Sequence, residues 1–389
     1  MAGIAATRLA SLVGDLSTER PPLYAALAAR LQLLVGDGRL PVGVRLPAER
    51  ELALALGLSR STVTAAYRRL RDDGWADALQ GSGTWTRLPA GPAAGAWVPG
   101  PTRAGALDLV HAAPAAPPQV TAAFSAALQD LPRFLPGHGY HPFGLPELRA
   151  RLADRYTAQG LPTVPEQVLV TAGALHGLAT AVRALTAPGD RVLVEHPSYP
   201  NALDAVTAAR ARAVPVAVDA DAPDAVAGDM LRTARQTGPR LAYVMPDFQN
   251  PTGLLLDAEQ RRRLAAGLAQ SGVVTVVDET LRDVALDVEV PPPLAALAPA
   301  SSTVTVGTLS KAVWGGLRVG WLRADAELVR RLGATAVRSH LSGPVLEQLA
   351  ACHLLDLLGD VLAVQRRRLR DQRDRLLGGL SSRLPDWHV

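Results

Sequence analysis

Lysine is nearly absent from this chain. Of 40 basic residues only Lys311 is a lysine, and all the others are arginines. The alternative account is codon bias, which would favour arginine throughout, but it does not explain why one position kept a lysine. Arginine stays protonated and cannot act as an amine nucleophile, whereas lysine can lose its proton and form a Schiff base. The composition therefore singles out Lys311 as a position that requires an amine.

Cysteine and long apolar runs are scarce as well. The single cysteine, Cys352, excludes an intramolecular disulfide, and it lies in no cluster with metal-ligand spacing, so we predict no metal site. No uninterrupted apolar stretch reaches the length of about 18 residues that a membrane span requires. The N-terminus also lacks the charged region of a secretion signal. We therefore expect a cytoplasmic protein with no membrane association.

The length of 389 residues exceeds one ordinary core and fits roughly two or three domains. Residues 87–105 are rich in Pro, Gly and Ala, which is typical of a linker. Helical and then turn-rich sequence precedes this segment, and a longer part follows it. We predict an N-terminal domain over residues 1–86, a linker over 87–105 and a C-terminal domain over 106–389.

The N-terminal domain contains the pattern of a helix-turn-helix. Pro47 stands at a favourable first position of a short helix that ends at Leu56. Gly57 begins the turn, Ser59 is placed to cap the next helix, and that helix runs over residues 60–71. Two helices joined by a short glycine-containing turn are the geometry of a helix-turn-helix.

The second helix has an arginine and short hydroxyl side chains at its N-terminal end, as a reader of the DNA major groove does. These residues are Arg60, Ser61 and Thr62. Farther along, two short β-capable runs flank a glycine-rich turn. A hairpin there forms a wing that offers backbone amides, with Ser82 or Thr84, to a phosphate. A generic three-helix module is the alternative interpretation of the helical part.

The C-terminal domain alternates short apolar runs with helical patterns. The runs cover residues 168–171, 191–195, 214–218, 241–245, 273–278 and 303–307. Strands separated by helices predict a mostly parallel sheet with helices on both faces. After Trp321 the pattern turns helical, and we interpret the arginines of residues 365–375 as a solvated helix face rather than a second DNA site.

Polar groups follow two of the predicted strands. Lys311 and Arg318 come soon after the run that ends at residue 307, and Asp278 ends another run. Open parallel sheets bind their ligands at the carboxyl ends of strands. Pyridoxal phosphate requires an imine-forming lysine, a phosphate cradle, an acid beside its pyridine nitrogen and a flat group over its ring. The sequence offers the lysine and the acid at one edge of the sheet.

Three further candidates each have an alternative interpretation. Asn250 could donate to the ring hydroxyl of the cofactor, or simply make an Asn-Pro turn. The turn at Gly173 and Ala174 leads from a strand into a helix and offers free amides to a phosphate, or is an ordinary glycine turn. Tyr199 could stack on the pyridine ring, or be a core residue.

Three separate segments resemble the GntR-type winged helix-turn-helix. They are Leu46-Pro-Ala-Glu-Arg-Glu-Leu-Ala, Leu58-Ser-Arg-Ser-Thr-Val-Thr-Ala-Ala-Tyr-Arg-Arg-Leu and Gly81-Ser-Gly-Thr. The resemblance implies that the domain binds double-stranded operator DNA. The candidate DNA-binding residues are Arg45, Glu49, Arg50, Ser59, Arg60, Ser61, Thr62, Arg68, Ser82, Gly83 and Thr84.

Residues 106–389 resemble fold type I aminotransferases, because the elements above occur together and in this order. The resemblance implies pyridoxal 5'-phosphate as cofactor, with Lys311 as its Schiff-base lysine and catalytic residue. Asp278 then partners the pyridine nitrogen, and Asn250 donates to the ring hydroxyl. The remaining candidate cofactor residues are Thr308, Ser310 and Arg318 at the phosphate, with Gly173, Ala174 and Tyr199.

A GntR-type module, a linker and an aminotransferase-like domain form the architecture of the MocR-type regulators. The predicted fold class is multidomain α+β and α/β, with a fold type I large domain. The resemblance implies a bacterial transcriptional regulator and a head-to-tail homodimer. It implies sensing of pyridoxal phosphate, or of an amine or amino-acid effector, through an aldimine on Lys311. The alternatives are an active aminotransferase with an appended DNA-binding domain, and a DNA-binding protein with a cofactor-free scaffold.

Two features depart from the family pattern. Family members commonly have a tyrosine two or three residues after the pyridinium aspartate, where this chain has Thr280 and Leu281. The phenol that bonds the ring oxygen is thus missing, and we expect at most weak transamination. Fold type I proteins also carry a small C-terminal domain with an arginine for the substrate carboxylate. The chain stops near the start of that domain, so we expect the domain to be truncated.

Overall fold

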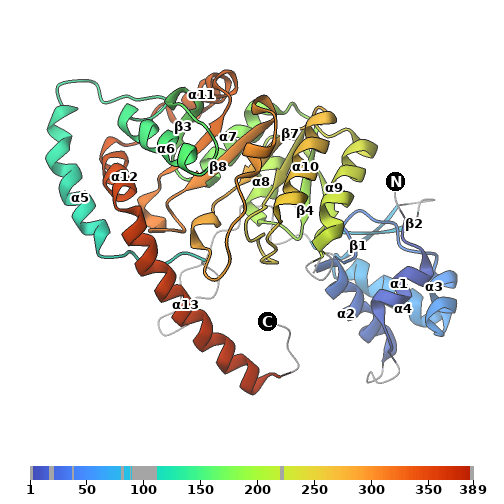
Figure 1. Ribbon diagram of the computed structural model, residues 1–389. Coiled ribbons are helices and arrows are strands. Elements are labelled where there is room, and N and C mark those ends of the chain that lie inside the picture. The colour runs from blue at the N-terminus through green and yellow to red at the C-terminus, as the bar shows by residue number, and fades with distance from the viewer. Residues whose placement is uncertain are drawn as a thin grey trace.

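The computed structural model describes residues 3–16, 22–36, 39–79, 83–87, 89, 112–219 and 223–385. Within them, a helical head with a small hairpin is followed by a larger α/β body (Figure 1). The predicted linker, residues 87–105, lies outside the described residues except at 87 and 89. No helix in the described part of the chain is long and apolar enough to cross a membrane.

The described residues of the head form four helices and a two-stranded antiparallel hairpin. Its elements are α1 (Ala6–Val13), α2 (Leu23–Gly36), α3 (Glu49–Leu56), α4 (Arg60–Asp72), β1 (Ala76–Leu79) and β2 (Gly83–Thr86). Gly57, at a φ of +64°, turns the chain between α3 and α4, and the Ser59 side chain accepts a hydrogen bond from the Thr62 amide at 3.1 Å. The predicted winged helix-turn-helix is confirmed.

The start of α3 differs from the prediction. Ala48 is its N-cap and Glu49 its first residue, so Pro47 lies before the helix rather than in its first turn. The Pro47 carbonyl instead accepts a hydrogen bond from the buried Tyr67 hydroxyl of α4 at 3.0 Å. Proline is suited to this place because its conformation favours an extended approach to the helix. The bond fixes α3 against the recognition helix.

The body is organised around a seven-stranded sheet in the order β3-β9-β8-β7-β6-β4-β5. Its strands are β3 (Val168–Thr171), β4 (Arg191–His196), β5 (Arg212–Ala217), β6 (Leu241–Val244), β7 (Val274–Asp278), β8 (Thr303–Thr308) and β9 (Gly320–Ala324). The five strands from β8 to β5 are parallel, and β9 runs antiparallel to both of its neighbours. The predicted mostly parallel sheet is confirmed.

Strand β9 was not predicted, and helix was expected to begin after Trp321. Instead Trp321 lies inside β9, and α11 begins at Ala326. The strand is short and follows a glycine-rich turn, so its sequence shows no clear alternation. The strand pairs with β8 and β3 and is fully buried. Tertiary contacts can thus make a segment a strand although its own sequence shows only a weak preference for that structure.

Helices cover both faces of the sheet, as predicted. The helices in the described part of the body are α5 (Gln119–Asp130), α6 (Pro146–Ala158), α7 (Ala174–Leu185), α8 (Pro200–Ala208), α9 (Pro223–Thr237), α10 (Ala258–Gln270), α11 (Ala326–His340), α12 (Val345–Asp356) and α13 (Leu358–Arg383). Successive strand residues enter different cores: Val276 packs with α7, α8 and α11, whereas Val277 packs with α9 and α10. This alternation follows from the period of two in a strand.

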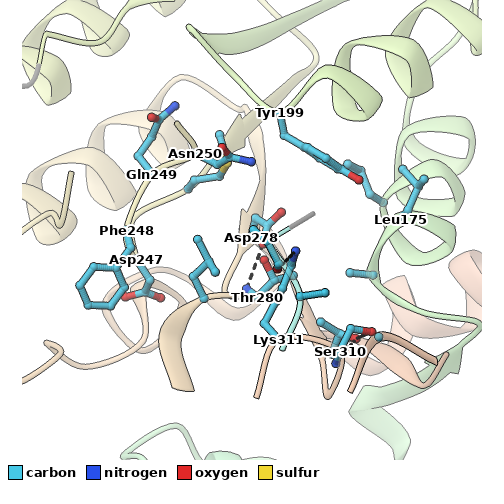
Figure 2. A pocket seen from close by; sticks show the side chains of 18 of the residues that line it. Leu175, Tyr199, Asp247, Phe248, Gln249, Asn250, Asp278, Thr280, Ser310 and Lys311 are labelled. Carbon is cyan, nitrogen blue, oxygen red and sulfur yellow. Dashed lines mark hydrogen bonds between the residues drawn. The ribbon is translucent and has the colours of Figure 1, made fainter. Parts of the chain in front are cut away.

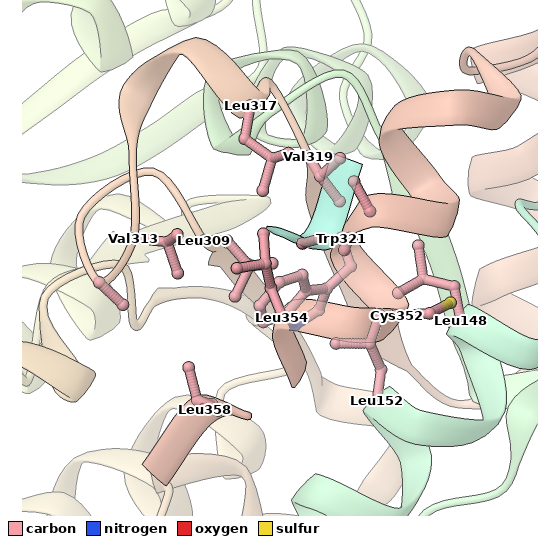
Figure 3. Packing of buried hydrophobic residues seen from close by; sticks show 14 of the residues in the cluster. Leu148, Leu152, Leu309, Val313, Leu317, Val319, Trp321, Cys352, Leu354 and Leu358 are labelled. Carbon is pink, nitrogen blue, oxygen red and sulfur yellow. The ribbon is translucent and has the colours of Figure 1, made fainter. Parts of the chain in front are cut away.

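A third core joins the end of the sheet to α6, α12 and α13 (Figure 3). Trp321 and Leu309 pack there against Leu152, and the free thiol of Cys352 lies among these side chains. Burial raises the pKa of that thiol to about 12. Cys352 is therefore a packing residue. No group of three or more potential metal ligands occurs among the described residues.

Helix α13 extends away from the body in Figure 1. Our interpretation of its arginines as a solvated face is only partly right. Arg366 donates to the Asp283 carbonyl at 2.9 Å, and Arg370 and Arg373 form ion pairs with Asp287. These contacts attach one face of α13 to the chain that follows β7.

Candidate functional site

A cavity of about 430 Å³ opens at the carboxyl ends of the parallel strands (Figure 2). This volume lies within the range of roughly 300–1,000 Å³ that is usual for cofactor and ligand sites. Of the predicted cofactor residues, those that line it are Ala174, Tyr199, Asn250, Asp278, Thr308, Ser310, Lys311 and Arg318. Gly173 lies beside them, next to Arg318. Folding thus brings together residues that are separated by more than a hundred positions in the sequence.

Lys311 follows β8, and its side chain enters the cavity. Its Nζ donates a hydrogen bond to the Ala112 carbonyl at 2.7 Å. Burial lowers the pKa of the amine, and the nearby Asp278 carboxylate opposes part of that change. The neutral, nucleophilic form of the amine is therefore more populated at neutral pH than in a solvent-exposed lysine.

Asp278 is the last residue of β7 and is largely buried. Its Oδ1 accepts a hydrogen bond from the Thr280 amide at 2.9 Å, and its Oδ2 accepts one from the Tyr243 hydroxyl at 2.6 Å. Sequence reasoning missed Tyr243. The available signal was a polar aromatic residue inside the otherwise apolar run of β6, because a buried tyrosine usually finds a partner for its hydroxyl.

Backbone geometry shapes the corner around Arg318. A Cβ added to Gly173, whose φ is +86°, would lie 3.0 Å from the Arg318 guanidinium. A Cβ on Gly320 would lie 2.6 Å from the Gly173 backbone, so β9 also requires a glycine there. Arg318 itself adopts a φ of +52°, a conformation that folded proteins concentrate at functional sites.

The same corner gathers groups suited to an anion. Helix α7 begins at Ala174 with no side-chain cap, so its first amides have no partner from that source. Ser310 and Thr308 lie across from it, with their hydroxyl oxygens 2.9 Å apart. Unpaired helix amides, hydroxyls and a guanidinium together form a site that fits a phosphate group.

Two loops complete the opposite wall, and the buried Gln249 connects them. Its Nε2 donates to the Pro197 carbonyl at 2.8 Å and to Glu195 at 3.2 Å, beside the segment that carries Tyr199. Its own loop carries Asn250 into the cavity. Burial raises the pKa of Glu195 to about 8. Sequence reasoning missed both Gln249 and Glu195, because their importance depends on contacts between distant segments.

The donor set fits pyridoxal phosphate. One cavity is lined by the Lys311 amine, whose pKa is lowered, by the buried Asp278 carboxylate and by the Asn250 amide, and the phosphate-sized corner beside Arg318 opens into it. These are the groups that this cofactor requires. Thr280 lines the cavity where family members commonly have a tyrosine. Tyr243 does not replace that phenol, because its hydroxyl already donates to Asp278.

The second candidate site is the exposed face of the head at the start of α4. The Arg60 side chain is 73% exposed, and Ser61 and Thr62 form hydrogen bonds to the capping Ser59 hydroxyl at 2.8 Å. Arg45 lies against Gly83 of the wing. The other candidates there are Glu49, Arg50, Arg68 and Thr84, of which Arg50 and Arg68 are exposed. Ser82 lies outside the described residues.

Comparisons with known proteins agree with both halves of this architecture. The family of class I and II aminotransferases matches residues 114–389, and the gntR family of bacterial regulatory proteins matches residues 23–85. The HTH-type transcriptional regulator YdcR of Escherichia coli is 30% identical over 90% of this chain and 78% of its own length. The HTH-type pyridoxine biosynthesis transcriptional regulator PdxR of Corynebacterium glutamicum is 31% identical over 82% of this chain and 69% of its own.

A solved structure matches part of the chain. α-Aminoadipate aminotransferase LysN from Thermus thermophilus, in complex with N-(5'-phosphopyridoxyl)-L-leucine, is 27% identical. It covers 69% of this chain and 68% of its own, with a TM-score of 0.62. The chain therefore belongs to the aminotransferase class I and II family. With its gntR-family head it is an HTH-type transcriptional regulator of the MocR type, and the predicted cofactor, pyridoxal phosphate, is the cofactor of this family.

Proposed function

We propose that this regulator senses pyridoxal phosphate, or an amine or amino acid that reacts with it, at Lys311, and transmits the state of that site to the DNA-binding head. The observation that carries the proposal is the joint placement of Lys311, Asp278 and Arg318 in one cavity. Lys311 is the only lysine of the chain. The name of PdxR, a regulator of pyridoxine biosynthesis, supports the cofactor itself as the effector.

Each residue of the cavity has a separate task in this proposal. When bound, pyridoxal phosphate supplies an aldehyde with which a neutral lysine amine can condense. Arg318, Ser310 and the first amides of α7 hold the phosphate. Asp278 holds a proton at the ring nitrogen, and Asn250 donates to the ring oxygen.

We further propose that sensing dominates over turnover. Thr280 supplies a hydroxyl with neither the reach nor the acidity of a phenol, so the bond to the ring oxygen that assists transamination is weakened. A regulator requires reversible occupation of the site and needs no rapid chemistry. A slow or undetectable exchange of amino groups with a keto acid would agree with this interpretation.

The head contacts the body close to the cavity. The His196 side chain, at the end of β4, lies 3.2 Å from the Val35 carbonyl at the end of α2. His196 precedes Tyr199 by three residues. A change in the conformation of the Tyr199 loop can therefore alter the contact between His196 and the head. We propose that the protein assembles as a head-to-tail homodimer. We also propose that its two domains comprise residues 1–86 and 106–389, and that a linker over residues 87–105 joins them.

The DNA-binding part is tested by exchanging arginines on opposite sides of α4. Arg60→Ala removes an exposed cation at the groove-facing end, and we expect operator binding to weaken by roughly 1–3 kcal/mol. Arg69→Ala is the matched control, because Arg69 lies nine residues later, about 180° around the helix, and pairs with Asp73. A gel-shift titration measures both. Equal losses in the two variants would show that α4 is not oriented as proposed.

A further inference from the structure

We propose that Tyr243 is a positioning residue for the cofactor: its hydroxyl holds the Asp278 carboxylate in the direction of the cavity. The inference rests on the proposed function, in which Asp278 binds the ring nitrogen of pyridoxal phosphate. Tyr243 does not line the cavity and acts only through Asp278.

The register of the sheet produces the contact. Tyr243 of β6 lies opposite Val276 of β7, and Asp278 follows Val276 by two residues on the same face. Side chains at such diagonal positions on neighbouring strands are within reach of each other when one is long. The tyrosine hydroxyl spans this offset and lies 2.6 Å from Oδ2 of the aspartate.

Burial gives the hydrogen bond its importance. Tyr243 is 1% exposed and Asp278 is 9% exposed, so little water reaches the carboxylate. In the described part of the chain only the Tyr243 hydroxyl and the Thr280 amide donate to it. Burial of a carboxylate is unfavourable unless hydrogen-bond donors replace the lost water. Since a carboxylate has about four lone-pair sites, room remains for the N–H of the cofactor ring.

Tyr243 remains a donor over the ordinary pH range. Burial and the neighbouring carboxylate raise the pKa of its hydroxyl far above the usual value. The other ionisable groups that face Asp278 are Lys311 and Glu195. Both are retained when Tyr243 is changed, so their titration is common to the wild type and the variant.

The test compares two buried tyrosines. Tyr243→Phe removes the donor to Asp278, and Tyr156→Phe removes a buried hydroxyl that bonds Trp321 at 2.9 Å and does not line the cavity. The affinity for pyridoxal phosphate is measured by absorbance titration at several pH values, with thermal unfolding of the cofactor-free proteins as a folding control. We expect Tyr243→Phe to weaken binding roughly tenfold or more at neutral pH. The pH profile of binding should also differ from that of the wild type, because the carboxylate that faces the ring nitrogen has lost a donor.

A purely structural role would give a different result. Tyr156→Phe should shift the unfolding temperature and leave the pH profile of binding unchanged. If folded Tyr243→Phe binds with the affinity and profile of the wild type, the inference about Tyr243 is wrong while the proposed function stands. If the wild type does not bind the cofactor, both are overturned.

A second inference starts from the hydrogen bond between Lys311 and Ala112. We propose that the free amine of Lys311 latches the segment that leads from the linker into the body, and that reaction of the amine releases it. The Nζ–O distance is 2.7 Å, and Ala112 and Ala113 both border the cavity. Slightly farther along, the buried Gln365 donates to the Ala115 carbonyl at 3.1 Å and holds the segment to α13. The Lys311 amine therefore holds the start of the segment at Ala112, while Gln365 holds it at Ala115.

The chemistry of the amine explains the release. Condensation with the cofactor aldehyde forms a C=N bond, and the aldehyde oxygen leaves as water with two protons from the nitrogen. The nitrogen would then carry at most one N–H and could not turn it freely. It would therefore not donate to the Ala112 carbonyl as the free amine does, and we expect occupation of the site to free the start of the segment.

Hydrogen–deuterium exchange of the peptide over residues 112–120 tests the latch. We expect exchange to be roughly two- to tenfold faster in Lys311→Met without cofactor than in the wild type, and faster in the wild type after addition of pyridoxal phosphate. Lys311→Arg keeps a donor but cannot condense, so the cofactor should not affect its exchange. Equal exchange in cofactor-free Lys311→Met and wild type would refute the latch. Absence of a cofactor absorbance band in the wild type would instead contradict the proposed function.

Discussion

At the scale of single residues, the cavity depends on positions that favour glycine. Gly173 is the clearest case, because it combines a φ of +86° with the nearby Arg318 guanidinium. Gly320 of β9 lies so close to the Gly173 backbone that it has no room for a Cβ. These glycines allow the start of α7 and the Arg318 side chain to face the same phosphate-sized space.

Gly173→Ala should therefore weaken cofactor binding. The backbone conformation disfavours a Cβ by roughly 1–3 kcal/mol, and the new methyl would displace Arg318. Titration with pyridoxal phosphate measures the loss. Gly359→Ala in α13 is the control, since a Cβ there meets nothing within 4 Å. Unchanged affinity in Gly173→Ala would place the phosphate elsewhere.

Glu195 gives the body a specific pH dependence. Its pKa is about 8 when folded against an ordinary 4.5, so between these values the folded state binds more protons than the unfolded state. The free energy of unfolding should therefore fall as the pH rises through this window, by up to about 1.4 kcal/mol per pH unit. Glu195→Gln should flatten the slope, and denaturant unfolding at pH 5, 6 and 7 measures it.

Buried Glu279, whose pKa is also about 8, leaves part of the slope in the variant. A slope identical to that of the wild type would show that Glu195 is ionised when folded.

Sequence reasoning recognised residues with an intrinsic chemical signature. Lys311 stood out as the sole lysine, and Asp278 as the acid that ends an apolar run. Tyr243, Gln249 and Glu195 had no such signature, because their roles arise from partners across the sheet or on another loop. Contacts of this kind depend on strand order, and the sequence alone did not predict that order.

At the scale of elements, strong periodic patterns gave the correct structure and weak ones did not. The apolar runs became β3 to β8, and the capped pattern at Ser59 became α4. Strand β9 was not predicted, because it forms through antiparallel pairing with a neighbour on each side, β3 and β8, rather than through its own sequence pattern. Helix α13 carries so many arginines that its pattern suggested solvent exposure, whereas three of them attach it to the segment after β7.

Asp287→Asn should loosen α13. The adjacent Arg370 and Arg373 hold the pKa of Asp287 below its usual range, so the ion pairs are present at neutral pH and lost in acid. Hydrogen exchange of the α13 amides should be faster in the variant, because local opening becomes easier. Asp374→Asn removes a carboxylate that pairs within the helix itself, and serves as the control. The same exchange rates in Asp287→Asn and wild type would mean that other contacts hold the helix.

At the scale of the whole molecule, the proposed function requires communication between the cavity and the head. Among the described residues, the hydrogen bonds from Lys311 to Ala112 and between His196 and Val35 lie between the surroundings of the cavity and the head or the linker. The first leads toward the linker and the second to the end of α2. A regulator needs such contacts to depend on the ligand, because a ligand shifts a conformational equilibrium only through contacts that differ between the two states.

The most direct test of the central claim is the absorbance spectrum of the purified protein with pyridoxal phosphate, for the wild type and Lys311→Ala. Because the chain has one lysine, no other side chain can form the same adduct. We expect a visible absorbance band in the wild type that is absent from the variant. A band of equal strength in both proteins, or no band in the wild type, would contradict cofactor sensing at Lys311.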